Sequence, residues 1–111
     1  MYVFIALWNV KPGWLALSRD QRAAFIDQVT AKMDALVEDG FGVLCWAANE
    51  TETAHRADYD YVGLWKMSDE SMVRQFEETL ATAGWYAYFD QVNLRGRWSE
   101  PEDVLRKMML L

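Results

Sequence analysis

The chain has 111 residues, a formal net charge of −6 and one cysteine. An acidic chain without a basic cluster does not suit nucleic acid, because neutralising phosphates requires grouped Lys and Arg side chains. One cysteine cannot form an intramolecular disulfide or a thiolate metal site, and no apolar run approaches the roughly 20 residues that cross a bilayer.

Length and hydrophobicity favour one domain that self-associates. A chain of this length fits a single domain over residues 1–111. Its hydrophobic content of 52% is high, which indicates apolar surface left for a second subunit. The N-terminus lacks the charged and apolar regions of a signal peptide, so we expect a cytoplasmic protein without a membrane segment.

The first half of the chain predicts a strand, a helix and another strand. Residues 2–9 are continuously apolar and rich in β-formers, which is typical of a buried central strand. Ser18 and Gln21 form a capping box that begins a helix. Asp39-Gly40 ends this helix, because glycine tolerates left-handed backbone geometry. Residues 41–49 then predict the second strand.

The second half adds two more strands and two more helices. A polar connection covers 50–56, a third strand about 57–67, a second helix from Ser68-Asp69 to Gly84, a fourth strand 91–98, and a short helix ends at Met109. The buried row of the second helix is predicted to be Met72, Phe76 and Leu80. Cys45, inside the second strand, is interpreted as a small buried hydrophobe.

The order β-α-β-β-α-β predicts an α+β, ferredoxin-like fold. Right-handed crossovers give a four-stranded antiparallel sheet with both helices on one face and strands one and three in the centre. Side chains alternate between the two faces of a strand. We expect an aliphatic set beneath the helices: Val3, Ile5, Leu7, Val43, Ala47, Val62 and Leu64. We expect an aromatic set on the helix-free face: Trp8, Trp46, Tyr59, Tyr61 and Trp65.

An aromatic sheet face is larger than the apolar patches that monomers expose. Two copies packed face to face around a two-fold axis would cover it. In element order and face chemistry the chain resembles the dimeric α+β-barrel superfamily. That group includes cofactor-free monooxygenases, muconolactone isomerase-like proteins, ethyl tert-butyl ether degradation-type proteins and chlorite dismutase-like haem proteins. The resemblance covers nearly the whole chain, rests on no sequence motif, and implies a homodimer.

The aromatic set has two interpretations, which are compatible. Trp8, Trp46, Tyr59 and Trp65, together with Tyr61, could enclose a flat apolar ligand, or they could form the core of the dimer. Buried indole and phenol hydrogens need acceptors. By strand position the candidate acceptors are Asn9, Asn49, Gln91 and Asn93. Asn93 could also orient a carbonyl or carboxylate of the ligand.

His55 and Tyr61 are the candidate catalytic residues. His55 is the chain's one histidine. If the third strand begins early, its neutral imidazole points to the barrel side and could remove a proton from a phenol or an activated carbon acid. The alternative is an ordinary exposed connection. We expect no cofactor, since no glycine-rich loop cradles a phosphate; haem held through His55 is the alternative.

Asp60 shares its predicted face with Val62 and Leu64, beneath the helices. A carboxylate buried there must be paired, and Arg56 or an arginine of the first helix is the expected partner.

Two functions therefore stand side by side. The enzymatic hypothesis is cofactor-independent oxygenation or isomerisation of a flat apolar substrate held by Trp8, Tyr61 and Trp65. The alternative is a non-catalytic binding or interaction module whose aromatic face is only the dimer core.

Overall fold

The structure is a computed structural model that describes residues 1–37 and 41–111. Its elements are β1 (Tyr2–Val10), α1 (Pro12–Leu15), α2 (Arg19–Asp34), β2 (Gly42–Ala48), β3 (Tyr61–Met67), α3 (Glu70–Thr82), the short 3-10 helix η1 (Trp85–Ala87), β4 (Phe89–Arg97) and α4 (Pro101–Met109). The predicted helix end at Asp39-Gly40 lies outside the described residues.

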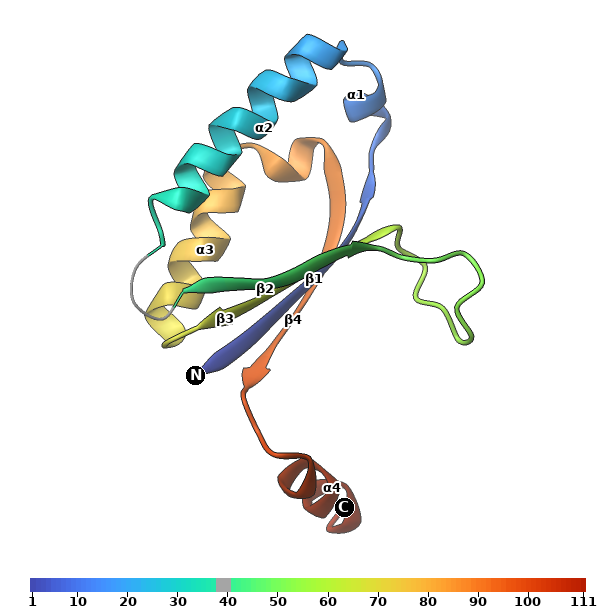
Figure 1. Cartoon of the computed structure of the whole chain (residues 1–111), viewed down its shortest axis with the longest axis vertical. Helices are drawn as coiled ribbons and strands as arrows, with labels where there is room; N and C mark the ends of the chain where they lie inside the picture. Colours follow the sequence, from blue (N-terminus) through green and yellow to red (C-terminus); the bar gives the residue numbers. More distant parts are fainter. Residues whose placement is uncertain (38–40) are drawn as a thin grey trace.

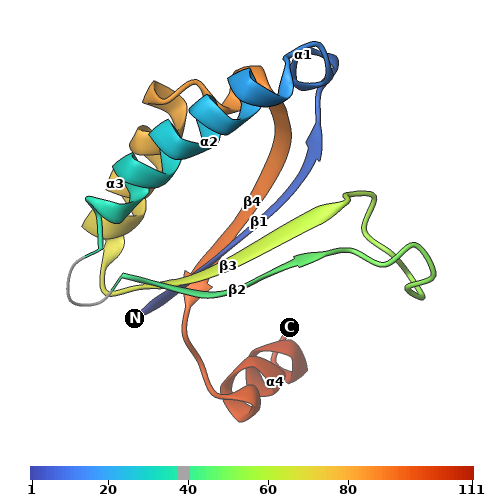
Figure 2. The same ribbon diagram turned by 45° about the horizontal axis from the view of Figure 1, so that its top comes forward.

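The four strands form one antiparallel sheet in the order β2-β3-β1-β4. Helices α2 and α3 lie on one side of it, whereas α4 lies on the other (Figures 1 and 2). The predicted α+β ferredoxin-like fold is therefore confirmed, with β1 and β3 as the central strands.

Local hydrogen bonds explain where the two long helices begin and end. The Ser18 Oγ accepts from the Gln21 backbone N–H at 3.1 Å, and the Ser18 N–H donates to the Gln21 Oε1 at 2.9 Å, which is the predicted capping box. The Asp69 Oδ1 accepts from the Met72 N–H at 2.9 Å and begins α3. Gly84, with φ of 83°, follows α3 in the left-handed region that glycine tolerates.

The assignment of the two sheet faces was wrong. Phe76 of α3 contacts Phe4 and Trp65, with ring centroids 5.0 Å and 4.9 Å away. The residues beneath the helices are therefore Phe4, Ala6, Trp8, Trp65 and Met67, and all five are buried. The aliphatic set, except Val43, instead occupies the helix-free face, where Leu94 is 62% exposed. Because both faces are apolar, alternation shows which residues share a face but does not show which face the helices cover.

The second strand differs from the prediction because it contains a β-bulge. Val43 pairs with Trp65, but Cys45 pairs with Leu64, so the register shifts between Val43 and Cys45. One extra residue moves the following side chains to the other face. Val43 and Trp46 consequently share the helix side, and Cys45 lies on the helix-free side. Cys45 is exposed in the protomer, not buried as predicted.

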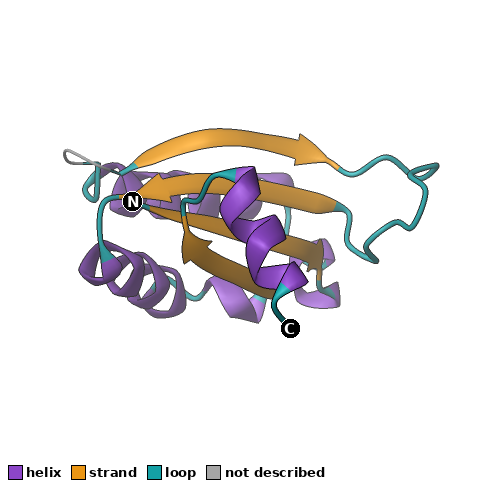
Figure 3. Ribbon diagram, turned by 90° about the horizontal axis from the view of Figure 1, so that it is seen from below, coloured by secondary structure: helices purple, strands orange, loops and turns teal. Residues whose placement is uncertain are grey.

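The side of the sheet away from α2 and α3, which we call the helix-free face because no helix in the described part of the chain packs on the sheet there, is apolar and open. We call its central residues the aliphatic face: Val3, Ile5, Leu7, Val62, Leu64, Val92 and Leu94. Helix α4 lies on this side (Figure 3) and exposes Val104, Leu105, Met108 and Met109. None of the helices in the described ranges is both long and apolar enough to cross a membrane.

Candidate functional site

A cavity of about 490 Å³ lies between the sheet and helix α2. Five of the chain's six tryptophans line it: Trp8, Trp14, Trp46, Trp65 and Trp85. The helix contributes Ile26, Val29, Thr30, Met33 and Asp34. Four of the five residues in the predicted aromatic set therefore line one cavity: Trp8, Trp46, Tyr61 and Trp65. This cavity lies inside one protomer, beneath its own helices.

Small residues of the sheet make room for the indoles. Ala6, Gly63 and Trp46 form one row across three strands. A Cβ added to Gly63 would lie 2.5 Å from the Trp65 Cη2 and 3.0 Å from the Trp46 Nε1. The Trp65 ring therefore lies directly over Gly63, close to the floor of the cavity, and leaves the space above it open.

Trp8 is the centre of the aromatic cluster. Its ring centroid lies 4.9 Å from that of Trp46, at an interplanar angle of 70°, and 6.0 Å from that of Trp85, at 73°. Tyr61 stacks on Trp8 at 6.0 Å and 29°. Edge-to-face and offset contacts of this kind stabilise aromatic pairs. In these contacts Trp46 and Trp85 are nearly perpendicular to Trp8. The three indoles are therefore not stacked parallel to one another.

Gln91 provides the hydrogen-bonding group on the sheet side of the cavity. The Trp85 Nε1–H donates to the Gln91 Oε1 at 2.8 Å, and the Gln91 Nε2–H donates to the Asn93 Oδ1 at 2.8 Å. The prediction that Gln91 accepts an indole hydrogen is confirmed. Asn93 is exposed and does not line the cavity. Its side chain accepts a hydrogen bond from Gln91 and does not contact the cavity. Gln91 itself was missed as a ligand contact, although it shares the strand parity of Asn93.

The cavity opens between α2 and β2. Four of the lining residues here are each at least 49% exposed: Ile26 of α2, Val43 and Trp46 of β2, and Val37, which follows α2. Tyr61, the one tyrosine among the described lining residues, is 40% exposed at the same opening. A ligand could enter here without separating a helix from the sheet.

His55 is not part of this arrangement. Strand β3 begins at Tyr61, so His55 belongs to the connection between β2 and β3 and not to an early third strand. It is exposed, has a left-handed φ of 54°, and does not line the cavity. Tyr59 lies in the same connection and likewise does not line the cavity. The expected position of both side chains on the sheet face was wrong.

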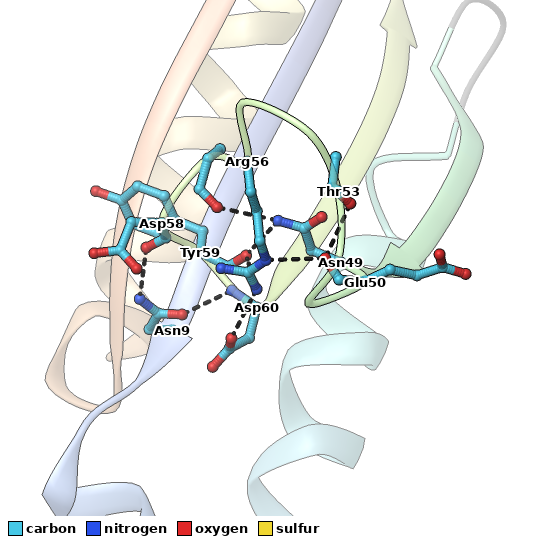
Figure 4. A network of polar contacts seen from close by, with 9 residues as sticks. Asn9, Asn49, Glu50, Thr53, Arg56, Asp58, Tyr59 and Asp60 are labelled. Carbon is cyan, nitrogen blue, oxygen red and sulfur yellow. Dashed lines mark hydrogen bonds and ion pairs between the residues drawn. The ribbon is translucent and has the colours of Figure 1, made fainter.

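The β2–β3 connection is held by a polar network (Figure 4). The Asn49 Nδ2–H donates to the Ala57 and Tyr59 carbonyls, at 3.1 Å and 2.8 Å. Arg56 donates to the Glu50 carbonyl at 3.0 Å and to the Tyr59 carbonyl at 3.1 Å. It also pairs with the Asp60 carboxylate at 3.2 Å, which confirms the predicted partner. Asp60, however, is 63% exposed and not beneath the helices.

The haem alternative does not fit these residues. His55, the proposed axial ligand, lies outside the cavity. The described lining also contains no Lys, Arg or His to pair with the two carboxylates that haem carries. Within residues 1–37 and 41–111, no group of three or more His, Cys, Asp or Glu side chains could hold a metal ion.

Solved structures share the fold. A mutant chlorite dismutase from Candidatus Nitrospira defluvii superposes with a TM-score of 0.74 at 16% identity, over 96% of this chain and 44% of its own. The Arabidopsis thaliana protein At3g17210 gives a TM-score of 0.60 at 14% identity, over 90% and 97%. A dimeric ferredoxin-like protein of unknown function from Thermobifida fusca gives 0.54 at 15% identity, over 87% and 90%.

These likenesses concern the fold alone, because identities of 14–16% do not carry function. The chain also spans less than half the length of the chlorite dismutase. No curated protein matches the sequence. A family model does match, over residues 1–111, and the chain therefore belongs to the family of unknown function DUF6616.

Proposed function

We propose that this protein binds a small, flat, mostly apolar molecule in the cavity between α2 and the sheet. The observation that carries the proposal is an opening onto about 490 Å³ lined by five tryptophans and Tyr61. Ligand sites typically measure roughly 300–1,000 Å³ and combine apolar walls with a few polar groups. Gln91, Thr30 and Asp34 are such polar groups here.

A catalytic version of this function would depend on Tyr61. Cofactor-free oxygenation or isomerisation needs a group that can exchange a proton with the bound substrate, within hydrogen-bonding reach. Tyr61 lines the cavity, whereas His55 does not. Replacing Tyr61 with Phe would remove the hydroxyl and keep the ring. We therefore place binding first and treat turnover as a second function, to be measured by comparing Tyr61→Phe with His55→Ala.

We also propose that the protein forms a homodimer through the aliphatic face. Supporting this, Leu94 and Val92 are 62% and 43% exposed on a face that no helix of the protomer covers. The Thermobifida fusca structure of the same fold is described as dimeric. This chain matches 44% of a chlorite dismutase chain. Two copies of it together would therefore be about as long as one chlorite dismutase chain.

A fluorescent ligand tests the binding proposal. N-phenylnaphthylamine is flat and uncharged, and we expect it to bind the purified protein with a Kd on the order of micromolar. Val29→Trp adds an indole from the buried side of α2 into the cavity, so binding should fall by at least about tenfold. Ala23→Trp is the matched control, because Ala23 is exposed on the same helix and does not line the cavity.

Two results would contradict the proposal. One is the absence of saturable binding of any flat apolar molecule to the unmodified protein. The other is equal affinity in Val29→Trp and Ala23→Trp, which would place the bound fluorophore elsewhere on the surface.

A further inference from the structure

The charge of the described cavity lining is of one sign, which is negative. Asp34 is the one charged residue among the described lining residues, which include no Lys, Arg or His. Asp34 is exposed, in contrast to Trp8, Trp65 and Trp85, which line the cavity and are buried. An anionic ligand would therefore meet no countercharge, and moving an anion out of water without a partner is unfavourable.

The nearby basic side chains are engaged outside the cavity. The Arg22 guanidinium lies 5.9 Å from the centroid of the Trp14 ring and donates to the Trp14 and Leu15 carbonyls. The Lys11 Nζ donates to the Tyr86 carbonyl at 2.7 Å. Lys32, in the last turn of α2, is also absent from the lining. None of the three lines the space in which a carboxylate or phosphate would lie among the rings.

Two further features favour positive charge at the opening. Asp34 is the last residue of α2, a helix of 16 residues, and the carbonyl end of a helix carries partial negative charge. Trp46 lines the same opening and is 53% exposed there. Aromatic faces attract cations, and tryptophan does so most strongly.

We propose that the ligand is a hydrophobic cation: an amine or quaternary ammonium group on a flat apolar body. The body occupies the tryptophan-lined interior, and the cation lies near the Asp34 carboxylate at the C-terminal end of α2. This inference rests on the proposed binding function and narrows its ligand class. It excludes carboxylates and phosphates of the same shape.

Three molecules with one ring system test the proposal: naphthylmethylamine, naphthylmethanol and naphthoate, all of the same isomer. At neutral pH they are a cation, a neutral molecule and an anion. Titration calorimetry at moderate salt should give the amine a Kd about tenfold below that of the alcohol. Naphthoate should bind at least about tenfold more weakly than the alcohol.

Asp34→Asn should remove most of the preference for the amine and leave the affinity for the alcohol unchanged. Asp27→Asn is the matched control, because it changes the net charge equally from an exposed position on α2 that does not line the cavity. It should keep the preference.

The outcomes distinguish a failure of the cation preference from a failure of the proposed binding function. Equal binding of amine, alcohol and naphthoate would overturn the cation preference and leave the apolar cavity intact. An amine preference that Asp34→Asn preserves, or that Asp27→Asn also abolishes, would overturn the role of Asp34. If none of the three binds, the proposed function itself is wrong.

Discussion

At the scale of single residues, Gly63 decides how much of the cavity is open. Its missing side chain lets the Trp65 ring lie over the strand, with the Cη2 only 2.5 Å from where a Cβ would be. Gly63 lies inside strand β3. In a sequence, a glycine within a strand often indicates that a side chain or a backbone segment approaches the strand closely at that point. The approaching group could not be identified, because it depends on the indole two residues later folding back over its own strand.

Gly63→Ala should therefore both destabilise the fold and weaken ligand binding. The added methyl group must push the Trp65 ring into the cavity, and we expect a cost of about 1–3 kcal/mol in the free energy of unfolding. Urea denaturation and the N-phenylnaphthylamine titration measure the two effects. In Gly96→Ala, by contrast, the new methyl group meets nothing within 4 Å. Equal losses in both variants would show that backbone freedom, and not Trp65, explains the result.

His55 makes a second prediction at this scale, about stability and not catalysis. Its φ of 54° is left-handed, a conformation that β-branched residues strongly disfavour and glycine tolerates. His55→Val should lower the free energy of unfolding by about 1–2 kcal/mol, and His55→Gly should leave it unchanged or raise it. Ligand affinity should be the same in all three proteins. A loss of affinity in His55→Gly would instead connect this residue to the cavity.

At the scale of elements, Arg56 anchors the β2–β3 connection. Its side chain is mostly buried and holds two carbonyls and the Asp60 carboxylate. Arg56→Ala should cost about 1–3 kcal/mol, because the Glu50 and Tyr59 carbonyls each lose a charged donor and the Asp60 carboxylate loses its ion pair. The control is Arg74→Ala, whose pair with Glu70 is exposed on α3 and should be worth under about 1 kcal/mol. Amide hydrogen exchange at Asn49, whose N–H donates to the Asp60 carbonyl, should accelerate only in Arg56→Ala.

The elements themselves were largely predictable. Ser18, Asp69 and Gly84 mark helix ends through local hydrogen bonds or local backbone geometry, so a short stretch of sequence contains the cause. The β-bulge at Val43–Cys45 and the covered face of the sheet are different. Both depend on packing between residues far apart in the chain. The bulge follows no local signal, and two apolar faces give the same alternation.

The same difference explains the outcome for the candidate site. Trp8, Trp46, Tyr61 and Trp65 share a face because strand parity and pairing bring them together, and sequence could predict that. Strand parity could not predict that α2 forms one wall of the cavity. It also could not predict that Asp34 lines the cavity, because both facts depend on which face of the sheet the helix covers. His55 and Tyr59 were misplaced because the third strand was extended through a connection that Asn49 and Arg56 hold in place.

At the scale of the whole molecule, the aliphatic face should be an interface between two copies. Leu94→Glu introduces a charge at the most exposed residue of this face, so self-association should weaken by about tenfold or more with little change in the protomer fold. Analytical ultracentrifugation across micromolar concentrations measures this. Gln28→Glu adds the same charge on the exposed side of α2 and should stay dimeric. A monomeric unmodified protein would refute the interface.

Cys45 lies on the opposite face of the sheet from Trp8, Trp46 and Trp65, and this gives the protein two independent reporters. The chain's single thiol is exposed beside the aliphatic face, while five of its six indoles line the cavity. The rate at which Cys45 reacts with a thiol reagent should slow as concentration rises and copies pair. Intrinsic fluorescence should respond to ligand and stay constant through that change. Occupancy and assembly can thus be followed on the same unmutated protein.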